Sequence, residues 1–311
     1  MKQYWVFTKK EFVESVRTKK FLVILFVFAI IGILSPFTAK IMPDLIENLN
    51  QANIEINLAE PSSYDSLEQF FKNTQQMGLL VFIIIFNGIM KNELTSGSLI
   101  NMLTKGLKRR AVILSKISII SLVWTIAILV SFTITWVYTI NIFPDQDHHY
   151  VLFSVFCIWL FGLFLLIFLI FASLLTKSSY GHLLLMALVV IFGLIVNVFD
   201  KVQKYNPITL ASKNMDIIKG VLEPSYFYPS ILITILTSVL LLVLSILIFN
   251  KKKHKLKFSI GEWIRIVLFH VKALQAYPSI ITTKQQPWFW LGFLAYFPLL
   301  KSEIPRKMRI V

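Results

Sequence analysis

The chain has 311 residues, of which 56% are hydrophobic and 15% are charged, whereas a soluble domain carries about a quarter charged residues. The apolar residues gather into runs of roughly 18 to 26 residues, the length that crosses about 30 Å of hydrocarbon. This pattern excludes one large soluble core and predicts an all-α integral membrane protein. The net charge of +15 does not indicate nucleic-acid binding, because the basic residues flank the apolar runs and follow from membrane topology.

The first twenty residues are basic and precede the first apolar run. Trp5, Phe12 and Val16 recur at helical spacing with lysines elsewhere around the wheel, which predicts an amphipathic helix over residues 1–20 in the membrane interface. A cleaved signal peptide is disfavoured, because this segment is long for an n-region and no small-x-small site follows Leu34. We therefore expect the first apolar run to be retained as a span.

Six membrane spans follow from the apolar runs, within a transmembrane domain over residues 21–250. They cover Phe21–Ala39, Met77–Leu94, Val112–Ile140, Val151–Leu175, His182–Phe199 and Ser230–Phe249. Lysine and arginine are concentrated in the connections on the amino-terminal side of the predicted membrane, and acidic residues are commoner on the other side. Because lysine and arginine set orientation, we expect a multi-pass protein of the cell membrane with both termini in the cytoplasm.

The connections and the tail carry weaker signals. The external segment Lys40–Gln76 is polar and acidic but matches no calcium loop, so a solvated connector is expected. Between Asn206-Pro207 and Glu223-Pro224 lies a helix-compatible stretch, which predicts a short helix dipping toward the membrane. The basic tail over residues 251–311 is expected to hold interface-bound segments, because the apolar run Pro287–Leu300 is short for a seventh span.

The sequence contains no zinc-protease pair, no nucleophile elbow and no P-loop. We therefore expect neither an enzyme nor a resident cofactor, and an ATP-driven role would require a separate subunit. His148 and His149 share a short external turn with Asp145 and Asp147, but a hydrated loop explains these residues as well as a metal site does. The single cysteine, Cys157, lies in an apolar run, which excludes a disulfide framework.

The cores of the predicted spans lack Asp, Glu, Lys and Arg. Ion-coupled carriers place such groups in the membrane as coupling sites, so energy for any transport is expected to enter from elsewhere. Four hydroxyl residues cluster in the third span, namely Thr125, Ser131, Thr133 and Thr135. They either hydrogen-bond between helices or line a pathway, and helix packing is the favoured interpretation.

The connection between the second and third spans, residues 91–116, is the most specific stretch. It resembles the cytoplasmic loop of type-2 ABC transporter permeases, the membrane subunits of many bacterial exporters. That loop has a Glu at the membrane exit, a Gly-Ser/Thr pair, leucines, a basic residue and a Lys that opens the next span. The matching positions are Glu93, Gly97, Ser98, Leu103, Arg110 and Lys116. The family often has Pro before its basic residue, where this chain has Lys105-Gly106-Leu107-Lys108.

The amino terminus supports the resemblance, which covers about residues 1–253, because Lys10–Phe21 looks like the family's interfacial helix running into its first span. In a cytoplasmic coupling helix of this kind, Glu93 near a helix amino terminus is favoured by the helix dipole, and Gly97 permits a tight bend. The partner-facing surface expected here consists of apolar Leu99, Ile100 and Leu103 with a rim of Lys105, Lys108 and Arg109. The alternative is an ordinary basic loop whose charge serves topology alone.

The resemblance implies a permease subunit of an ATP-driven exporter that pairs with a second copy or a related permease among the membrane lipids. Each permease would dock a separate ATPase subunit, which would hold the ATP and Mg²⁺. An antimicrobial peptide, a drug or a lipid-like molecule is the expected cargo, and no nucleic acid is involved. One alternative is a membrane sensor or assembly scaffold that transports nothing. Another is an ATP-independent carrier, which the lack of intramembrane charge disfavours.

Overall fold

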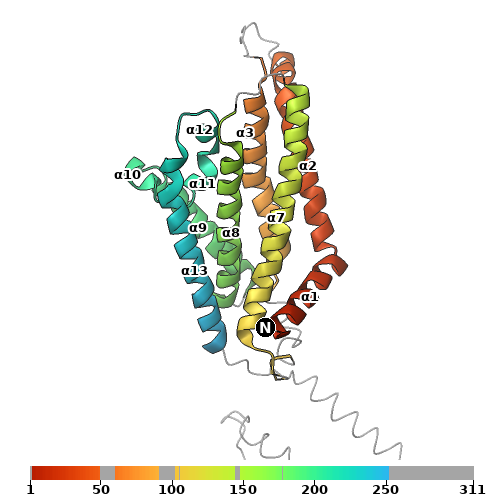
Figure 1. The fold of residues 1–311 in the computed structure, drawn as a ribbon, viewed down its shortest axis with the longest axis vertical. Helices are drawn as coiled ribbons and strands as arrows, with labels where there is room; N and C mark the ends of the chain where they lie inside the picture. The colour runs from red at the N-terminus through yellow and green to blue at the C-terminus, as the bar shows by residue number, and fades with distance from the viewer. Residues whose placement is uncertain are drawn as a thin grey trace, which may run out of the picture. The chain divides into compact units, whose positions relative to one another are not determined.

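The computed structural model describes residues 2–49, 60–90, 102–104, 106–143, 148–176 and 178–251, which belong to one unit of the chain, Met1–His254. These residues form helices joined by turns, with no strand among them, so the all-α class is confirmed (Figure 1). The interface segments expected in the tail lie outside the described residues.

The helices begin and end as follows: α1 Lys2–Arg17, α2 Lys20–Leu49, α3 Ser63–Asn73, the π-helix η1 Thr74–Gly78, α4 Leu79–Phe86, α7 Arg109–Ile142, α8 Val151–Leu175, α9 Ser179–Val196, α10 Asp200–Gln203, α11 Thr209–Ser212, α12 Asn214–Ile218, the 3₁₀ helix η2 Pro224–Phe227 and α13 Tyr228–Lys251. Within the described part of the chain, four stretches are long and apolar enough to cross a membrane, namely Lys20–Met42, Arg109–Ile142, Val151–Leu175 and Pro224–Lys251. They correspond to the predicted first, third, fourth and sixth spans, and α9 supplies a shorter apolar stretch, Tyr180–Val196, at the fifth.

The predicted second span differs most from the structure. Its helix begins at Ser63 instead of Met77, and residues 87–90 form a turn instead of continuing the helix. α3, η1 and α4 join without interruption, because the junction residues Thr74 and Leu79 keep right-handed helical angles. The external segment expected as a solvated connector is therefore partly helical, with α2 extending into it from one side and α3 from the other.

Local signals explain the early start of α3. The Asp65 carboxylate accepts a hydrogen bond from the Ser62 backbone N–H at 2.9 Å, which satisfies one of the donors left over at a helix amino terminus. α3 is polar overall, but Leu67, Phe70 and Phe71 lie on one buried face. Average hydropathy cannot detect such a face, because the polar residues around it cancel the apolar ones.

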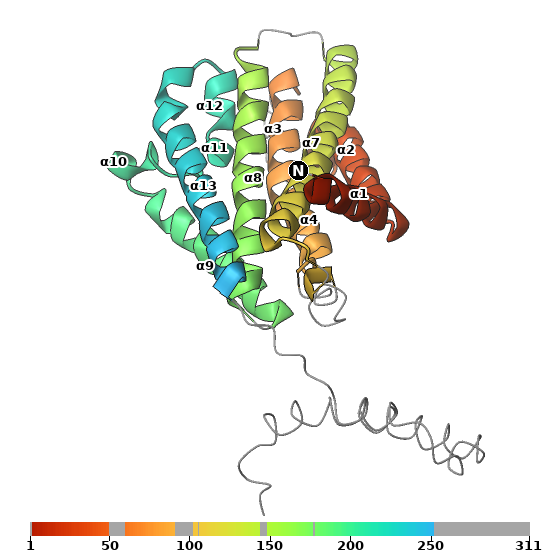
Figure 2. The ribbon, with the colours of Figure 1, turned by 60° about the horizontal axis from the view of Figure 1, so that its bottom comes forward.

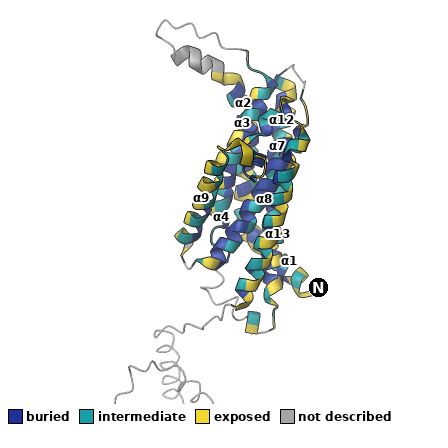
Figure 3. Cartoon of the chain, turned by 90° about the vertical axis from the view of Figure 1, so that its left-hand side faces the viewer, coloured by how far each residue is buried: buried dark blue, intermediate teal, exposed yellow. Residues whose placement is uncertain are grey.

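α8 lies in the middle of the bundle (Figure 2), and 67% of the residues in its most apolar 18-residue stretch are buried. α7 and α4 pack on one side of it, and α9 and α13 pack on the other. α2 packs along α7, with α1 against the start of α7 and α3 against both α2 and α7. Figure 3 shows the result, a buried centre along α8 and exposed residues along α9.

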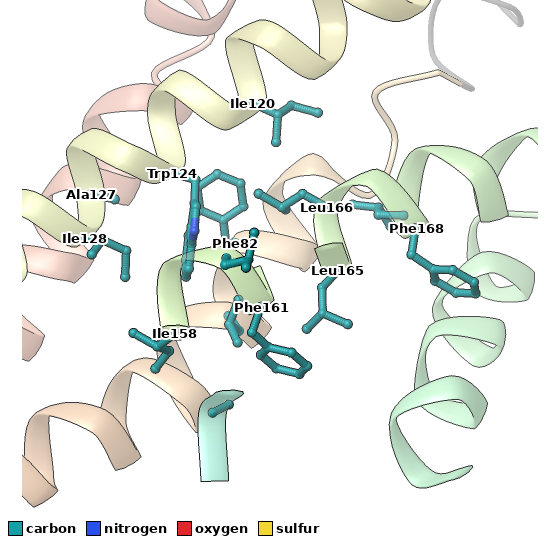
Figure 4. Packing of buried hydrophobic residues seen from close by; sticks show 14 of the residues in the cluster. Phe82, Ile120, Trp124, Ala127, Ile128, Ile158, Phe161, Leu165, Leu166 and Phe168 are labelled. Atoms are coloured by element: carbon teal, nitrogen blue, oxygen red, sulfur yellow. The ribbon is translucent and has the colours of Figure 1, made fainter. Parts of the chain in front are cut away.

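The core between α4, α7 and α8 is built around one indole (Figure 4). The Trp124 ring meets the Phe28 and Phe82 rings edge-on, with ring centroids 5.7 and 5.4 Å away. Its Nε1 donates a hydrogen bond to the Trp159 carbonyl at 3.0 Å. The indole reaches α8 over Gly162, where an added Cβ would lie 2.2 Å from the Trp124 ring. Glycine at this position therefore lets α7 and α8 approach closely.

α13 binds the bundle through a narrow stripe of small polar residues. Ser230, Thr234 and Ser238 recur every fourth residue on its buried face, and such residues let membrane helices pack closely. Only 11% of the residues in the most apolar 18-residue stretch of Pro224–Lys251 are buried. Leu236, Val239 and their neighbours therefore form an exposed apolar face.

The stretch between Asn206-Pro207 and Glu223-Pro224 contains short helices, as the sequence predicts. α11 and α12 pack against α8 through Leu210, Ile217 and Ile218, which are buried. The cap they form is tied together by side-chain hydrogen bonds, such as that from Thr209 Oγ1 to Asn197 Oδ1 at 3.0 Å. This satisfies polar groups that the turns would otherwise leave buried and unpaired.

Candidate functional site

The start of α1, the start of α7 and the end of α13 lie at the same end of the bundle (Figure 1). We call this the basic end, because it carries Lys2, Lys108, Arg109, Arg110 and Lys251. Residues 102–104 and 106–116 of the predicted coupling segment belong to it. Six residues singled out in that segment lie outside the described part of the chain: Glu93, Gly97, Ser98, Leu99, Ile100 and Lys105.

A glycine turn leads the segment into α7. Residues 102–104 are helical, and the chain then reverses with Gly106 N–H donating to Leu103 O at 3.1 Å and Leu107 N–H to Met102 O at 3.2 Å. This pair of bonds is a Schellman motif, in which the residue at Gly106 must take a left-handed conformation. Gly106 has φ +92°. Gly106 and Leu107, in the stretch where the family often has Pro, thus end the helical turn by a different means.

We expect Gly106→Ala to destabilise this turn by about 1–2 kcal/mol, because an L-residue pays that cost in the left-handed region. Nothing lies within 4 Å of the added Cβ, so the cost is conformational and not steric. Gly106→Asn is the matched variant, since asparagine tolerates this region better. Thermal unfolding can be followed with a thiol-reactive dye on the buried Cys157. Equal unfolding temperatures for wild type and Gly106→Ala would contradict the assignment.

α1 is bound to this turn by two hydrogen bonds of one side chain. The Gln3 amide donates from Nε2 to Gly106 O and accepts at Oε1 from the Lys108 backbone N–H, both at 3.2 Å. One residue further along, Tyr4 Oη and Ser118 Oγ form a hydrogen bond of 2.8 Å. The first turn of α1 is therefore bound to the turn before α7 and to α7 itself.

A buried ion pair joins the next two turns of α1 to α7. Lys116 Nζ donates to both carboxylate oxygens of Glu11 at 3.0 Å, and the side chains are 1% and 5% exposed. Lys10 Nζ adds a second contact to Glu11 Oε1 at 3.0 Å. Both ammonium groups lie near the Phe7 ring, at 5.1 Å for Lys10 and 5.8 Å for Lys116. Charges buried in this way require such partners, because an unpaired charge in a dry interior is very costly.

Arg109 connects the start of α7 to the end of α13. Its Nη1 donates to the carbonyls of Phe249 at 2.5 Å and Asn250 at 3.2 Å, and the guanidinium lies 5.6 Å from the Phe249 ring centroid. The last carbonyls of a helix lack intrahelical donors and carry the negative end of its dipole. Arg109 therefore caps α13 from a distant part of the chain.

The exit from α4 is anchored as well. His182, near the start of α9, is buried and donates from Nε2 to Asn87 O at 2.8 Å. Its Nδ1 lies 3.4 Å from Thr176 Oγ1 in the connection between α8 and α9. The described chain before residue 91 is thus held by α9, and the described chain after residue 105 is held by α1 and α13.

The described residues of the predicted coupling set take three different roles. Leu103 is half-buried and packs against the hydrophobic core. Arg109 and Lys116 bind to α13 and α1, as described above. Arg110 is exposed at the basic end, so its guanidinium is accessible to a partner.

The hydroxyl residues of the third span also separate. Thr125 Oγ1 accepts from the Trp159 indole at 3.0 Å, across the α7–α8 contact. Thr135 Oγ1 donates to Gly32 O at 3.1 Å, across the α2–α7 contact. Ser131 is buried in the same bundle, whereas Thr133 is exposed. Thr125 and Thr135 thus lie between helices, and Thr133 alone of the four faces outward.

The sequence reasoning missed Gln3, Glu11 and His182 as anchors. A signal for Glu11 was present, because Phe7, Glu11 and Ser15 share one face of α1 at a spacing of four. Glu11 on this face and Lys116 near the start of an apolar span carry opposite charges. Their pairing, however, depends on a tertiary contact that the sequence does not show. No cluster of three or more metal-ligand side chains occurs among the described residues, where His148 instead hydrogen-bonds Ser63 at 2.8 Å.

The long apolar helices of the described residues define a multi-pass membrane protein. Residues 5–254 match the family described as ABC-2 family transporter protein, so the chain belongs to this family. The match begins at Trp5 within α1 and ends just after α13, which agrees with the extent of the resemblance seen in the sequence. A search of curated proteins finds no match. As a member of this family, the chain is a transport component of the membrane and not a catalytic enzyme.

Proposed function

We propose that the chain is the permease subunit of an ATP-driven exporter and that residues 91–116 couple it to a separate ATPase subunit. The observation that carries the proposal is the anchoring of this segment at both ends. Its entry is bound by His182 of α9, and its return by α1 and by the last turn of α13. A displacement imposed on the segment by a partner is therefore delivered to three helices at once.

The partner binds from the cytoplasm, where the basic end lies in this proposal. The concentration of lysine and arginine at the connections of this end supports that orientation. Arg110 and Lys108 are exposed there and supply a polar rim for the interface. ATP and Mg²⁺ bind in the ATPase subunit, since the permease chain has no P-loop.

Two permeases, either identical or related, form the pathway in the cell membrane. The exposed apolar faces of α13 and α9 support contacts with a second permease or with lipid, because few of their residues are covered within the chain. Nucleotide binding and hydrolysis then shift the paired bundles between inward-facing and outward-facing populations. The cargo proposed is amphipathic, such as an antimicrobial peptide, a drug or a lipid, in keeping with the apolar, phenylalanine-rich helices.

The first experiment is purification of the tagged chain from its native membranes in a mild detergent or in nanodiscs, with identification of the proteins that copurify. A stoichiometric ATPase with a P-loop is expected. Arg110→Glu should reduce its recovery, because it reverses the charge of an exposed group in the segment. Lys219→Glu is the matched control, since Lys219 is exposed near the carboxyl end of α12 in the outer cap and should leave recovery unchanged.

Glu93→Gln and Gly97→Val should uncouple ATP hydrolysis from transport while membrane insertion stays intact. The measurement is the ATPase rate of the copurified complex, together with transport, and it compares the wild-type permease with each variant. Wild-type coupling in both variants would contradict the assignment of the loop. Recovery of a signalling protein in place of an ATPase would instead support the sensor or scaffold function.

A further inference from the structure

A mixed apolar and polar face of α1, and not the apolar stripe predicted for it, packs against the bundle. The buried residues of α1 are Phe7, Glu11 and Ser15. Trp5 is 67% exposed and Phe12 is 39% exposed, although both belong to the stripe that the sequence predicts for the membrane interface. This arrangement leaves the stripe for lipid. α1 is attached to the protein by the buried Phe7 ring and by directional polar contacts.

These contacts run along α1 for about two turns and meet one continuous stretch of the chain. Gln3 binds Gly106 and Lys108, the Tyr4 hydroxyl binds Ser118, and Glu11 binds Lys116. Sliding or rotation of α1 along α7 would separate at least one of these pairs. Separating Glu11 from Lys116 would also strand charge in a buried environment, so this pair specifies the register of the two helices.

We propose that Glu11 is a positioning residue of the coupling site, which fixes α1 through Lys116 so that α1 and residues 106–118 move as one body. This rests on the proposed function, since the motion in question is the one that an ATPase partner imposes on the segment. The displacement then passes from α7 through α1 to α2. The link between α1 and α2 is short, a two-residue turn at Thr18-Lys19 with Lys19 at φ +58°.

The first test asks whether α1 and residues 106–118 are rigidly joined. Double electron–electron resonance on the full chain in nanodiscs measures the distance between two spin labels. Spin labels replace Lys9 of α1 and Leu114 of α7, which are exposed and lie outside the proposed partner-facing set, in a Cys157→Ser background. We expect a narrow distance distribution for the native pair and a broadened one for Glu11→Gln. The charge-exchanged variant, Glu11→Lys with Lys116→Glu, should narrow it again. An unbroadened Glu11→Gln distribution would overturn the proposal.

The coupling half is tested on the complex with its copurified ATPase. ATP with vanadate should leave the distance between the two labels unchanged, whereas a shift would show that α1 moves independently and would overturn the proposal. Glu11→Gln should still recover the ATPase at wild-type stoichiometry but lose the effect of the permease on its ATPase rate. Charge exchange should restore that effect. A loss of recovery itself would also contradict the proposal, because it would assign Glu11 to docking.

A cross-link distinguishes a fixed joint from one that must open. Tyr4→Cys and Ser118→Cys, bridged by a short bis-thiosulfonate reagent, lock the contact that the two hydroxyls make in the structure. We expect the locked complex to keep the wild-type effect on the ATPase rate, and inhibition by the cross-link would refute the rigid joint. Absence of any ATPase partner would refute the proposed function alone, because the spin-label measurement on the isolated chain decides the joint independently.

Discussion

Replacement of Lys116 by methionine is expected to lower the free energy of unfolding by about 3 kcal/mol. Breaking a buried ion pair by removing one partner costs about 3–5 kcal/mol, because the remaining charge stays buried without compensation. The lower end of this range applies here, since Lys10 still contacts Glu11 from a position where its side chain is 32% exposed. The measurement is thermal or denaturant unfolding in detergent, read by dye reaction with the buried Cys157.

Two variants separate lost charge pairing from lost packing. Lys116→Met combined with Glu11→Leu should recover most of the stability, because well-packed apolar residues replace a buried pair at little or no cost. Lys108→Met removes an exposed lysine at the start of α7 and should change stability by no more than about 0.5 kcal/mol. A Lys116→Met protein as stable as the Lys108→Met protein would show that the Glu11–Lys116 pair contributes nothing.

Gly162→Ala is expected to destabilise the chain by about 1–3 kcal/mol, the usual cost of overpacking. The added Cβ would lie 2.2 Å from Trp124 Cζ2 and 2.4 Å from Cε2. The indole cannot move aside easily, because it is bonded to Trp159 O and packed between Phe28 and Phe82. Unfolding with the same dye assay measures the effect.

The free-energy cost of Gly162→Ala should depend on the presence of the Trp124 indole. In a Trp124→Leu background, Gly162→Ala should be nearly neutral, and the difference between the two backgrounds is the coupling energy of the contact. Gly181→Ala in α9 is the control, because its added Cβ meets its nearest neighbour, Thr176 Cβ, at 3.2 Å. Equal effects of Gly162→Ala in both backgrounds would contradict the role of the indole in the contact between α7 and α8.

The structure separates the basic residues of segment 91–116 that bind within the chain from those that remain exposed. The resemblance drew attention to a row of basic residues, all of them compatible with partner binding. The structure assigns Arg109 to the carboxyl end of α13 and Lys116 to Glu11, so these two cations act within the permease. Lys108 and Arg110 remain exposed and are the described basic residues of the segment whose side chains are accessible.

Sequence alone determined the all-α class and much of the membrane architecture, because burial in hydrocarbon leaves a strong and local signal. α8 begins and ends at the predicted residues, Val151 and Leu175. A long apolar run between polar turns is compatible with few structures other than a membrane-spanning helix. The amino-terminal helix was likewise visible from its periodicity. α3 was missed because its buried face is diluted by polar neighbours within the same turns.

Only the tertiary structure decided what the polar groups do. The partners of Lys116 and Arg109 lie 105 and 140 residues away in the chain, and no local period reports such a pairing. A lysine beside a membrane span has the same sequence signature whether it serves topology, binds a partner or meets a buried carboxylate. Charge pairing depends on distance and burial in space, which is why the helices were predictable and the anchors of residues 106–116 were not.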